Sequence, residues 1–178
     1  MENDLAKILI TEESIKKRIK ELGKKISDDY RGKCPVLVTV LRGGFVFLAD
    51  LIREISIPLT LDFLSISSYS GQTHTGVVRI LKDLDRSIEN EHVILVEDII
   101  DTGLTLNYIL RTLKERGPAD IRVCALLDKK TRRIANIPID YRGFEIPDEF
   151  VVGYGMDYEQ KYRNLPYIAV LKEEILGR

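Results

Sequence analysis

The sequence contains no tryptophan and only two cysteines and two histidines among its 178 residues. Cys34 and Cys124 lie far apart and form no Cys-x-x-Cys motif. A disulfide framework is therefore not indicated, and we expect free thiols in a reducing compartment. Neither His74 nor His92 has metal-ligand spacing to another histidine or cysteine, so both are expected at the surface.

The chain also lacks an imbalance of charge and a long apolar run. Its 27 Lys and Arg residues balance 28 Asp and Glu residues, which gives no argument for binding nucleic acid or an acidic membrane. No stretch approaches the roughly 18 apolar residues of a membrane-spanning helix, and Met1–Asp4 does not resemble the start of a signal peptide. We therefore expect a cytoplasmic protein. Its length predicts one domain over residues 1–178, with no internal repeat.

The most informative stretch that is present runs from His92 to Thr105. Within it, Val93–Val96 is a short apolar run with β-branched character, as in a strand that is buried on both faces. Glu97 and Asp98 follow in a predicted acidic loop, and a small-residue turn then leads into a predicted helix over residues 104–116. Open α/β sheets bind their ligands at this kind of strand-to-helix connection.

The turn Asp101-Thr102-Gly103-Leu104-Thr105 predicts a phosphate site. Its glycine lets a ligand approach the backbone, its two threonines add hydroxyl donors, and the first amides of the helix have no partner within the helix. The preceding Glu97 and Asp98 would repel a phosphate, so we assign them to sugar hydroxyls or to Mg²⁺, a hard cation. From the residues alone, an ordinary turn with solvated acids remains the alternative.

This stretch closely resembles the phosphoribosyl pyrophosphate (PRPP) signature of the type I phosphoribosyltransferases. The resemblance lies in the full order of its parts: an apolar run, Glu-Asp, two apolar residues and Asp-Thr-Gly-x-Thr. Asp101 stands where the 6-oxopurine enzymes carry an aspartate and adenine enzymes typically carry an alanine. The chain therefore looks like the hypoxanthine-guanine phosphoribosyltransferases of the short bacterial kind. This resemblance implies an α/β fold with a mostly parallel central sheet flanked by helices, and a small hood formed by the chain ends, mainly residues 130–178.

The same resemblance implies an activity in purine salvage. The 5-phosphoribosyl group of PRPP would pass to N9 of hypoxanthine or guanine, giving IMP or GMP and pyrophosphate. Asp101 would be the catalytic residue that manages the proton on purine N7. The PRPP and phosphate ligands in this part of the chain would be Glu97, Asp98, Thr102, Gly103, Leu104 and Thr105.

A second motif follows the apolar strand Pro35–Leu41. Arg42-Gly43-Gly44 combines a cation with paired glycines, which allow unusual backbone geometry and exposed amides. Taken alone, it predicts only a turn. It resembles the family's Leu-(Lys/Arg)-Gly-Gly pyrophosphate loop, which implies PRPP binding by Leu41, Arg42, Gly43 and Gly44. The resemblance also implies a non-proline cis peptide between Leu41 and Arg42.

Two further segments point to a purine. Lys129 follows the predicted strand Ile121–Leu127, and a lysine at that end of a parallel strand faces the ligand crevice, although a solvated Lys-Lys pair is the alternative. Farther on, Phe150 could stack on a flat base and Val151 could pair with the edge of that base. The alternative is that these residues only form a turn, a strand and aromatic contacts of the core. The sequence does not reveal a role for Asp128.

By resemblance, Lys129 donates to purine O6, and residues 150–158 match the purine pocket Phe-Val-Val-Gly-Tyr-x-x-Asp-Tyr, which is followed by an arginine. The implied purine ligands are Lys129, Phe150, Val151 and Asp157. Arg163 would bind the PRPP phosphates, and Glu97, Asp98 and Asp157 would hold Mg²⁺.

Residues 65–76 are polar and contain glycine, which predicts a long loop. Loops of this length are often lids, and Ser68-Tyr69 matches the family loop that folds over the phosphoribosyl group. A passive hairpin connection is the alternative. The segment Phe45–Ile52 predicts a helix that is apolar nearly all round, and such a helix must be covered on more than one face. We therefore expect a homo-oligomer, a dimer or tetramer, with burial inside the monomer as the alternative.

Two other functions compete with transfer to hypoxanthine or guanine. A xanthine-preferring enzyme is the nearer one, whereas adenine or orotate would not require Lys129 and Asp101 together. The other is a nucleotide-sensing regulator on the same fold. Such a regulator would need a basic face, which the balanced composition does not indicate.

Overall fold

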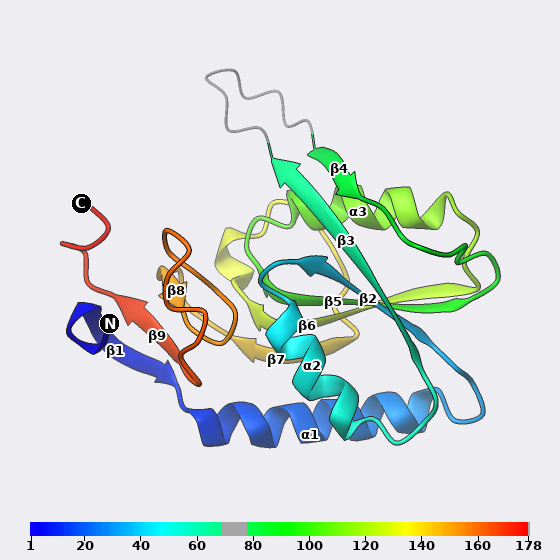
Figure 1. The fold of residues 1–178 in the computed structure, drawn as a ribbon, viewed down its shortest axis with the longest axis horizontal. Coiled ribbons are helices and arrows are strands. Elements are labelled where there is room, and N and C mark those ends of the chain that lie inside the picture. The colour runs from blue at the N-terminus through cyan, green and yellow to red at the C-terminus, as the bar shows by residue number, and fades with distance from the viewer. Residues whose placement is uncertain (69–77, 178) are drawn as a thin grey trace.

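The computed structural model describes residues 1–68 and 78–177, and its centre is a six-stranded sheet in the order β4-β3-β2-β5-β6-β7 (Figure 1). Strand β4 is antiparallel to β3, and every other pair of neighbours is parallel. The strands are β2 (Val36–Leu41), β3 (Thr60–Ser68), β4 (Val78–Lys82), β5 (His92–Ile100), β6 (Asp120–Asp128) and β7 (Tyr141–Glu145). The predicted mostly parallel α/β architecture is confirmed.

Helices cover both faces of this sheet. Helices α1 (Glu12–Asp29) and α2 (Phe45–Glu54) lie on one face, and α3 (Leu104–Lys114) lies on the other (Figure 1). Successive side chains of a strand point to opposite faces, and β5 shows this directly. Ile94 and Val96 belong to the core beneath α1 and α2, whereas Val93 and Leu95 belong to the core beneath α3. The predicted strand buried on both faces is therefore confirmed.

The two ends of the chain meet in a second, three-stranded antiparallel sheet, which we call the hood (Figure 1). It contains β1 (Leu5–Ile10), β9 (Ile168–Leu171) and β8 (Val151–Val152), in that order. Two short 3₁₀ helices complete the described elements, η1 (Glu2–Asp4) and η2 (Lys130–Arg132). The large sheet still takes β7 from the segment that we expected to form most of the hood.

The helix predicted over residues 104–116 ends at Lys114, and two predicted strand boundaries are wrong. Strand β5 continues to Ile100, so Glu97 and Asp98 lie on the strand and not in a loop after it. The reason is its ladder to β6, which continues through the pair Glu97–Ala125 to Ile100–Asp128. Strand β3 likewise continues to Ser68 by pairing with β4, so residues 65–68 are strand and not loop. The remainder of the predicted lid, including Tyr69, lies outside the described residues.

None of the helices in the described part of the chain is both long enough and apolar enough to cross a membrane.

Candidate functional site

The site lies at the carboxyl ends of β2, β5 and β6, where parallel strands end at one edge of the sheet. Two cavities open there. The turn cavity has a volume of about 210 Å³, and its lining includes Glu97, Thr102, Gly103 and Thr105. The wide cavity has a volume of about 490 Å³. Ile99 and Asp101 line both cavities, so the two are neighbours that meet at Asp101.

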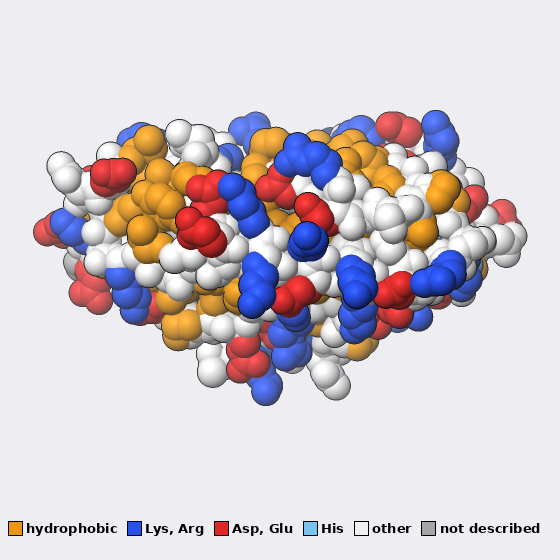
Figure 2. All heavy atoms as spheres, turned by 90° about the horizontal axis from the view of Figure 1, so that it is seen from below, with side chains coloured by type: hydrophobic (Ala, Val, Ile, Leu, Met, Phe, Trp, Pro, Cys, Tyr) orange, Lys and Arg blue, Asp and Glu red, His pale blue; other side chains and the backbone are white. Residues whose placement is uncertain are grey.

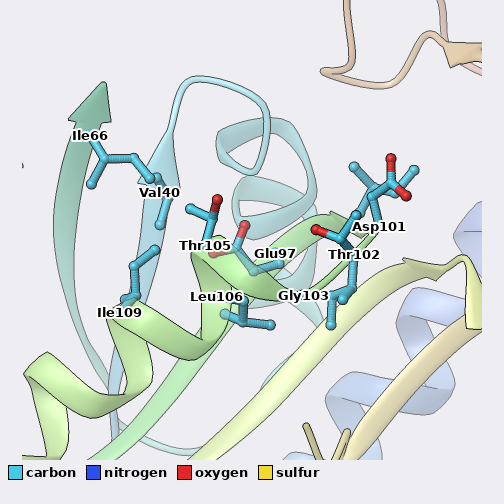
Figure 3. A pocket seen from close by; sticks show the side chains of 11 residues that line it. Val40, Ile66, Glu97, Asp101, Thr102, Gly103, Thr105, Leu106 and Ile109 are labelled. Carbon is cyan, nitrogen blue, oxygen red and sulfur yellow. The ribbon is translucent and has the colours of Figure 1, made fainter. Parts of the chain in front are cut away.

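Figure 3 shows the turn cavity, with Glu97 and Thr105 in its middle and apolar Val40, Ile66 and Ile109 at one end. The turn from Asp101 to Gly103 closes the other end. Gly103 has a positive φ of 77°, a backbone conformation that residues other than glycine rarely adopt. It precedes α3, whose first turn contains no acidic residue. The free amides at this helix start form a place for an anion.

The loop at the end of β2 has the backbone that the family resemblance implied. The Leu41–Arg42 peptide is cis. A side chain at Gly43 would overlap the carboxylate of Asp98, and a side chain at Gly155 would overlap the Gly43 carbonyl. The loop is thus packed between β5 and the segment after β8. Arg42 lines the wide cavity and donates a hydrogen bond from Nη1 to Gln160 Oε1 at 3.0 Å.

The neighbouring carboxylates of β5 face different cavities. Glu97 lines the turn cavity and Asp98 lines the wide cavity, because successive side chains of a strand point to opposite faces. Burial raises the pKa of Glu97 well above its ordinary value, and the charge of Asp98 adds to this rise. Burial also raises the pKa of Asp98, although its hydrogen bond from the Ile99 amide and the charge of Arg163 oppose the rise.

Asp157 and Arg163 form an ion pair on the far wall of the wide cavity, with 2.6 Å between Asp157 Oδ1 and Arg163 Nη2. Arg163 Nη1 also donates to the Gly155 carbonyl at 2.7 Å, which fixes the guanidinium next to the glycine loop. The loop and this wall together present two cations, Arg42 and Arg163, to one cavity. This arrangement suits a ligand with several negative charges.

A preformed metal cage is not found, because the described residues contain no group of three or more His, Cys, Asp or Glu side chains placed to hold an ion. The predicted metal ligands are divided, with Asp98 and Asp157 in the wide cavity and Glu97 in the turn cavity. The donor chemistry nevertheless fits Mg²⁺. A cation would stabilise carboxylates whose burial disfavours their charge, and Mg²⁺ commonly takes one or two carboxylates and completes its shell with phosphate oxygens and water.

Lys129 also lines the wide cavity and is 5% exposed. Its amide donates to the Ile100 carbonyl at 2.9 Å, which joins the ends of β5 and β6. Its Nζ is 3.9 Å from Asp148 Oδ1, so the ammonium has one carboxylate nearby. Phe150 lines the same cavity and packs edge-to-face on Tyr158, with 5.6 Å between the ring centroids. It is 40% exposed, which leaves part of the ring open to a flat ligand.

Asp128, whose role the sequence did not reveal, directly precedes Lys129 and is fully buried. Its Oδ1 accepts hydrogen bonds from Arg133 Nε and Nη2 at 3.0 and 2.9 Å, and its Oδ2 lies 3.0 Å from Arg142 Nε. Its carbonyl accepts from the Ile146 amide. Asp128 therefore ties the chain on both sides of Lys129 to β7, which is a structural role.

Sequence reasoning missed Arg132. It lines the wide cavity, and its Nε lies 3.2 Å from Asp101 Oδ1. The only signal was its position three residues after Lys129. A run of five residues with four cations, Lys129 to Arg133, is more typical of a solvated surface than of a pocket wall.

The predicted site residues are thus largely brought together. The wide cavity collects Arg42, Gly43, Asp98, Asp101, Lys129 and Phe150, together with Val151, Asp157 and Arg163. The turn cavity collects Glu97, Thr102, Gly103 and Thr105. Leu41, Gly44 and Leu104 line neither cavity, and the Leu104 side chain is 53% exposed, so any contact of Leu104 with a ligand would come from its backbone. The side chain of Ser68 is not described.

Comparison with known proteins agrees with this geometry. The phosphoribosyl transferase domain model matches residues 7–159. The hypoxanthine-guanine phosphoribosyltransferase of Bacillus subtilis is 47% identical over 176 residues, which cover 98% of each chain. A crystal structure of a Staphylococcus aureus hypoxanthine phosphoribosyltransferase has a TM-score of 0.96 and 49% identity, and covers 100% of this chain and 97% of that one.

A Trypanosoma cruzi hypoxanthine phosphoribosyl transferase, studied for the role of its C-terminal region in oligomeric state and activity, has a TM-score of 0.92 and 44% identity. The match covers 97% of this chain and 94% of that one. Fold, cavity residues and identity along the whole length agree, and the chain belongs to the phosphoribosyltransferase family, among its hypoxanthine-guanine members.

Proposed function

We propose that this chain transfers the 5-phosphoribosyl group of PRPP to N9 of hypoxanthine or guanine and releases pyrophosphate. The observation that carries the proposal is the meeting of two cavities at Asp101. One has the free amides of a helix start and suits a single phosphate. The other is lined by Arg42 and Arg163, by the partly exposed ring of Phe150 and by the buried Lys129. A ribose that bridges the two would hold its C1 beside Asp101.

Each end of the substrates then has a partner. The 5-phosphate takes the amides and hydroxyls of residues 102–105 in the turn cavity. The pyrophosphate takes Arg42, Arg163 and the amides of the glycine loop. The purine lies against Phe150 and Val151, with its O6 facing the ammonium of Lys129. A 6-oxo group accepts a hydrogen bond, which a buried ammonium can donate and a 6-amino group cannot accept.

In the reaction, purine N9 attacks C1 of the ribose while the bond from C1 to the pyrophosphate oxygen breaks. The ribose passes through an oxocarbenium-like state, and negative charge grows on the leaving group. Arg42 and Arg163 stabilise that charge from fixed positions. Asp101 accepts the proton that N7 must lose, and returns it in the reverse reaction. Asp98 and Asp157, or Glu97, would hold Mg²⁺, which would supply further charge neutralisation for the phosphates.

The test is a spectrophotometric assay with PRPP and Mg²⁺ that compares hypoxanthine, guanine, xanthine, adenine and orotate. We expect turnover with the first two bases. A higher kcat/KM for xanthine would support the xanthine-preferring alternative. Nucleotide binding without turnover of any base would support a regulator. The face of the molecule that carries α1 has Lys and Arg interspersed with Asp and Glu, so this face offers no continuous basic surface (Figure 2).

Metal dependence gives a second test. Because Glu97 and Asp98 are carboxylates with raised pKa values beside a phosphate site, we expect activity to vanish in excess chelator and to return when Mg²⁺ is added back. The measurement is initial velocity against free Mg²⁺ at constant PRPP. Undiminished turnover in excess chelator would contradict the assignment of these carboxylates to a metal.

We also propose a homo-oligomer and a cytoplasmic location. The cytoplasm would keep the free thiols of Cys34 and Cys124 reduced. For the oligomer, the support is an apolar hollow of about 410 Å³ beside α2, whose lining includes Phe45, Val46, Tyr154, Leu165 and Pro166. We call this the α2 hollow. Phe45 in it is 46% exposed, so together with the other apolar side chains of the hollow it offers a surface that a second subunit could cover.

A further inference from the structure

Arg132 reaches Asp101 from outside the motifs that define the family. It is the last residue of the short helix η2. A second carboxylate contacts its guanidinium, because Nη1 donates a hydrogen bond to Asp148 Oδ1 at 3.5 Å. The same Asp148 oxygen is 3.9 Å from Lys129 Nζ. Asp148 therefore anchors both cations, and Arg132 carries the contact on to Asp101 with 3.2 Å between Nε and Oδ1.

The two oxygens of Asp101 lie in different surroundings. Oδ1 is buried, and no group among the described residues donates a well-aligned hydrogen bond to it. The Asp101 side chain as a whole is 43% exposed, so its exposed surface belongs to the remainder, which includes Oδ2. A buried carboxylate oxygen needs a donor or a cation, and the cation beside Oδ1 is the Arg132 guanidinium, with Nε at 3.2 Å.

This division between the two oxygens has a consequence for proton transfer. A carboxylate that rotates freely can present either oxygen to the purine, and it spends part of its time in orientations from which no proton can be transferred. With the guanidinium beside the buried Oδ1, Oδ2 is left as the oxygen that can be exposed to a ligand. Holding a reacting group in one orientation is among the larger sources of rate enhancement in enzymes.

We infer that Arg132 is a positioning residue for Asp101, which it orients so that Oδ2 receives the proton of purine N7. The inference rests on the proposed function, because it requires Asp101 to be the proton acceptor. Arg132 does not have to contact the substrate for this role. The ion pair is also open to water, with Arg132 46% exposed, so it adds little to folding stability. Its removal can therefore be studied in a folded protein.

The experiment is a double-mutant cycle of Arg132→Gln and Asp101→Asn. The measurements are kcat and KM with hypoxanthine at saturating PRPP, PRPP affinity by calorimetry, and the midpoint of thermal unfolding. Lys130→Gln is the matched control, since Lys130 is the neighbouring cation and pairs with Glu145 instead of Asp101. Arg132→Lys tests whether charge alone suffices, because lysine lacks the Nε that approaches Oδ1.

We expect Arg132→Gln to lower kcat about tenfold, a size typical of coupling between residues in contact, with PRPP affinity and thermal midpoint unchanged. Arg132→Lys should recover only part of this loss, and Lys130→Gln should match wild type. In the Asp101→Asn background, Arg132→Gln should cause no further loss.

An unchanged kcat in Arg132→Gln would overturn the inference, and so would an equal loss with and without Asp101. If Asp101→Asn itself kept wild-type kcat, the proton step of the proposed function would fail, and the inference would fail with it.

Discussion

Single residues in this site act through charges that are placed where water is limited. Lys129 is almost fully buried with its ammonium in the wide cavity, and Glu97 and Asp98 have raised pKa values on β5. Such groups are poor choices for a stable core, because burial penalises each charge. Their presence at the carboxyl edge of a parallel sheet is what distinguishes a site from a scaffold.

Asp101→Asn tests the assigned proton acceptor. Asparagine has the same shape, so the turn and its phosphate cradle should remain, while proton transfer is lost. General acid–base catalysis typically contributes about 10²–10⁴-fold, so we expect kcat to fall within that range, with little change in PRPP affinity. Loss of PRPP binding with kcat intact at saturation would show that Asp101 only shapes the loop.

Lys129→Gln tests recognition of the base. The variant loses a charged donor that faces purine O6, so kcat/KM for guanine and hypoxanthine should fall by about 1–3 kcal/mol of transition-state stabilisation. PRPP affinity should change far less, because the 5-phosphate is assigned to the turn cavity and the pyrophosphate to Arg42 and Arg163, not to Lys129. The exposed neighbour Lys130 gives the control variant Lys130→Gln. Wild-type values for both bases would reduce Lys129 to a structural lysine.

At the scale of elements, the sequence predicts strands and helices best where one kind of residue dominates. The apolar run Val93–Val96 is buried on both faces as expected, and Thr11 caps α1 by accepting a hydrogen bond from the Ser14 amide at 3.3 Å. Strand ends were predicted less well. Glu97 and Asp98 read as a loop because charges usually end a strand, but a neighbouring strand supplies pairing that no local pattern reveals.

The same limit applies to the site. Motif order located the turn, the glycine loop and the purine block, and family resemblance supplied the cis peptide. Arg132 and the role of Asp128 could not be predicted in this way. Both depend on how the chain folds back after β6, so that Arg132 meets Asp101 and Asp128 meets Arg142. Contacts between segments of this kind leave no periodicity in the sequence.

Asp128→Asn tests the anchor between β6 and β7. The change removes the only carboxylate that the described contacts place beside both Arg133 and Arg142. The Arg133 guanidinium then loses its carboxylate partner, and Arg142 keeps only Glu145, at 3.6 Å. Breaking a buried pair of this kind commonly costs about 3–5 kcal/mol, and we expect about 3 kcal/mol in the free energy of unfolding, because Arg142 is partly open to water.

Denaturant unfolding measures this cost. Asp28→Asn is the control, since Asp28 pairs with Arg31 at the surface and its loss should hardly matter. An Asp128→Asn variant as stable as wild type would show that the buried carboxylate is not an anchor.

At the scale of the whole molecule, the hood and the large sheet leave one apolar region partly uncovered. Helix α2 buries Phe47, Leu48 and Leu51 in a core that it shares with the sheet and α1, so cover on more than one face comes partly from within the chain. Phe45 points outward into the α2 hollow. The glycine loop directly precedes this helix, so a partner subunit on the α2 hollow would also steady the pyrophosphate site.

Phe45→Glu tests this arrangement. A charge in the α2 hollow should disfavour association, so light scattering should show a smaller species for the variant than for wild type at the same concentration. Ile134→Glu is the matched control, because Ile134 is an apolar residue that is 70% exposed and lies outside the hollow. It should keep the wild-type mass.

If the smaller species of Phe45→Glu also shows a raised KM for PRPP while Ile134→Glu does not, association and the pyrophosphate loop are linked. A wild-type protein that is monomeric at assay concentration would contradict the proposed oligomer.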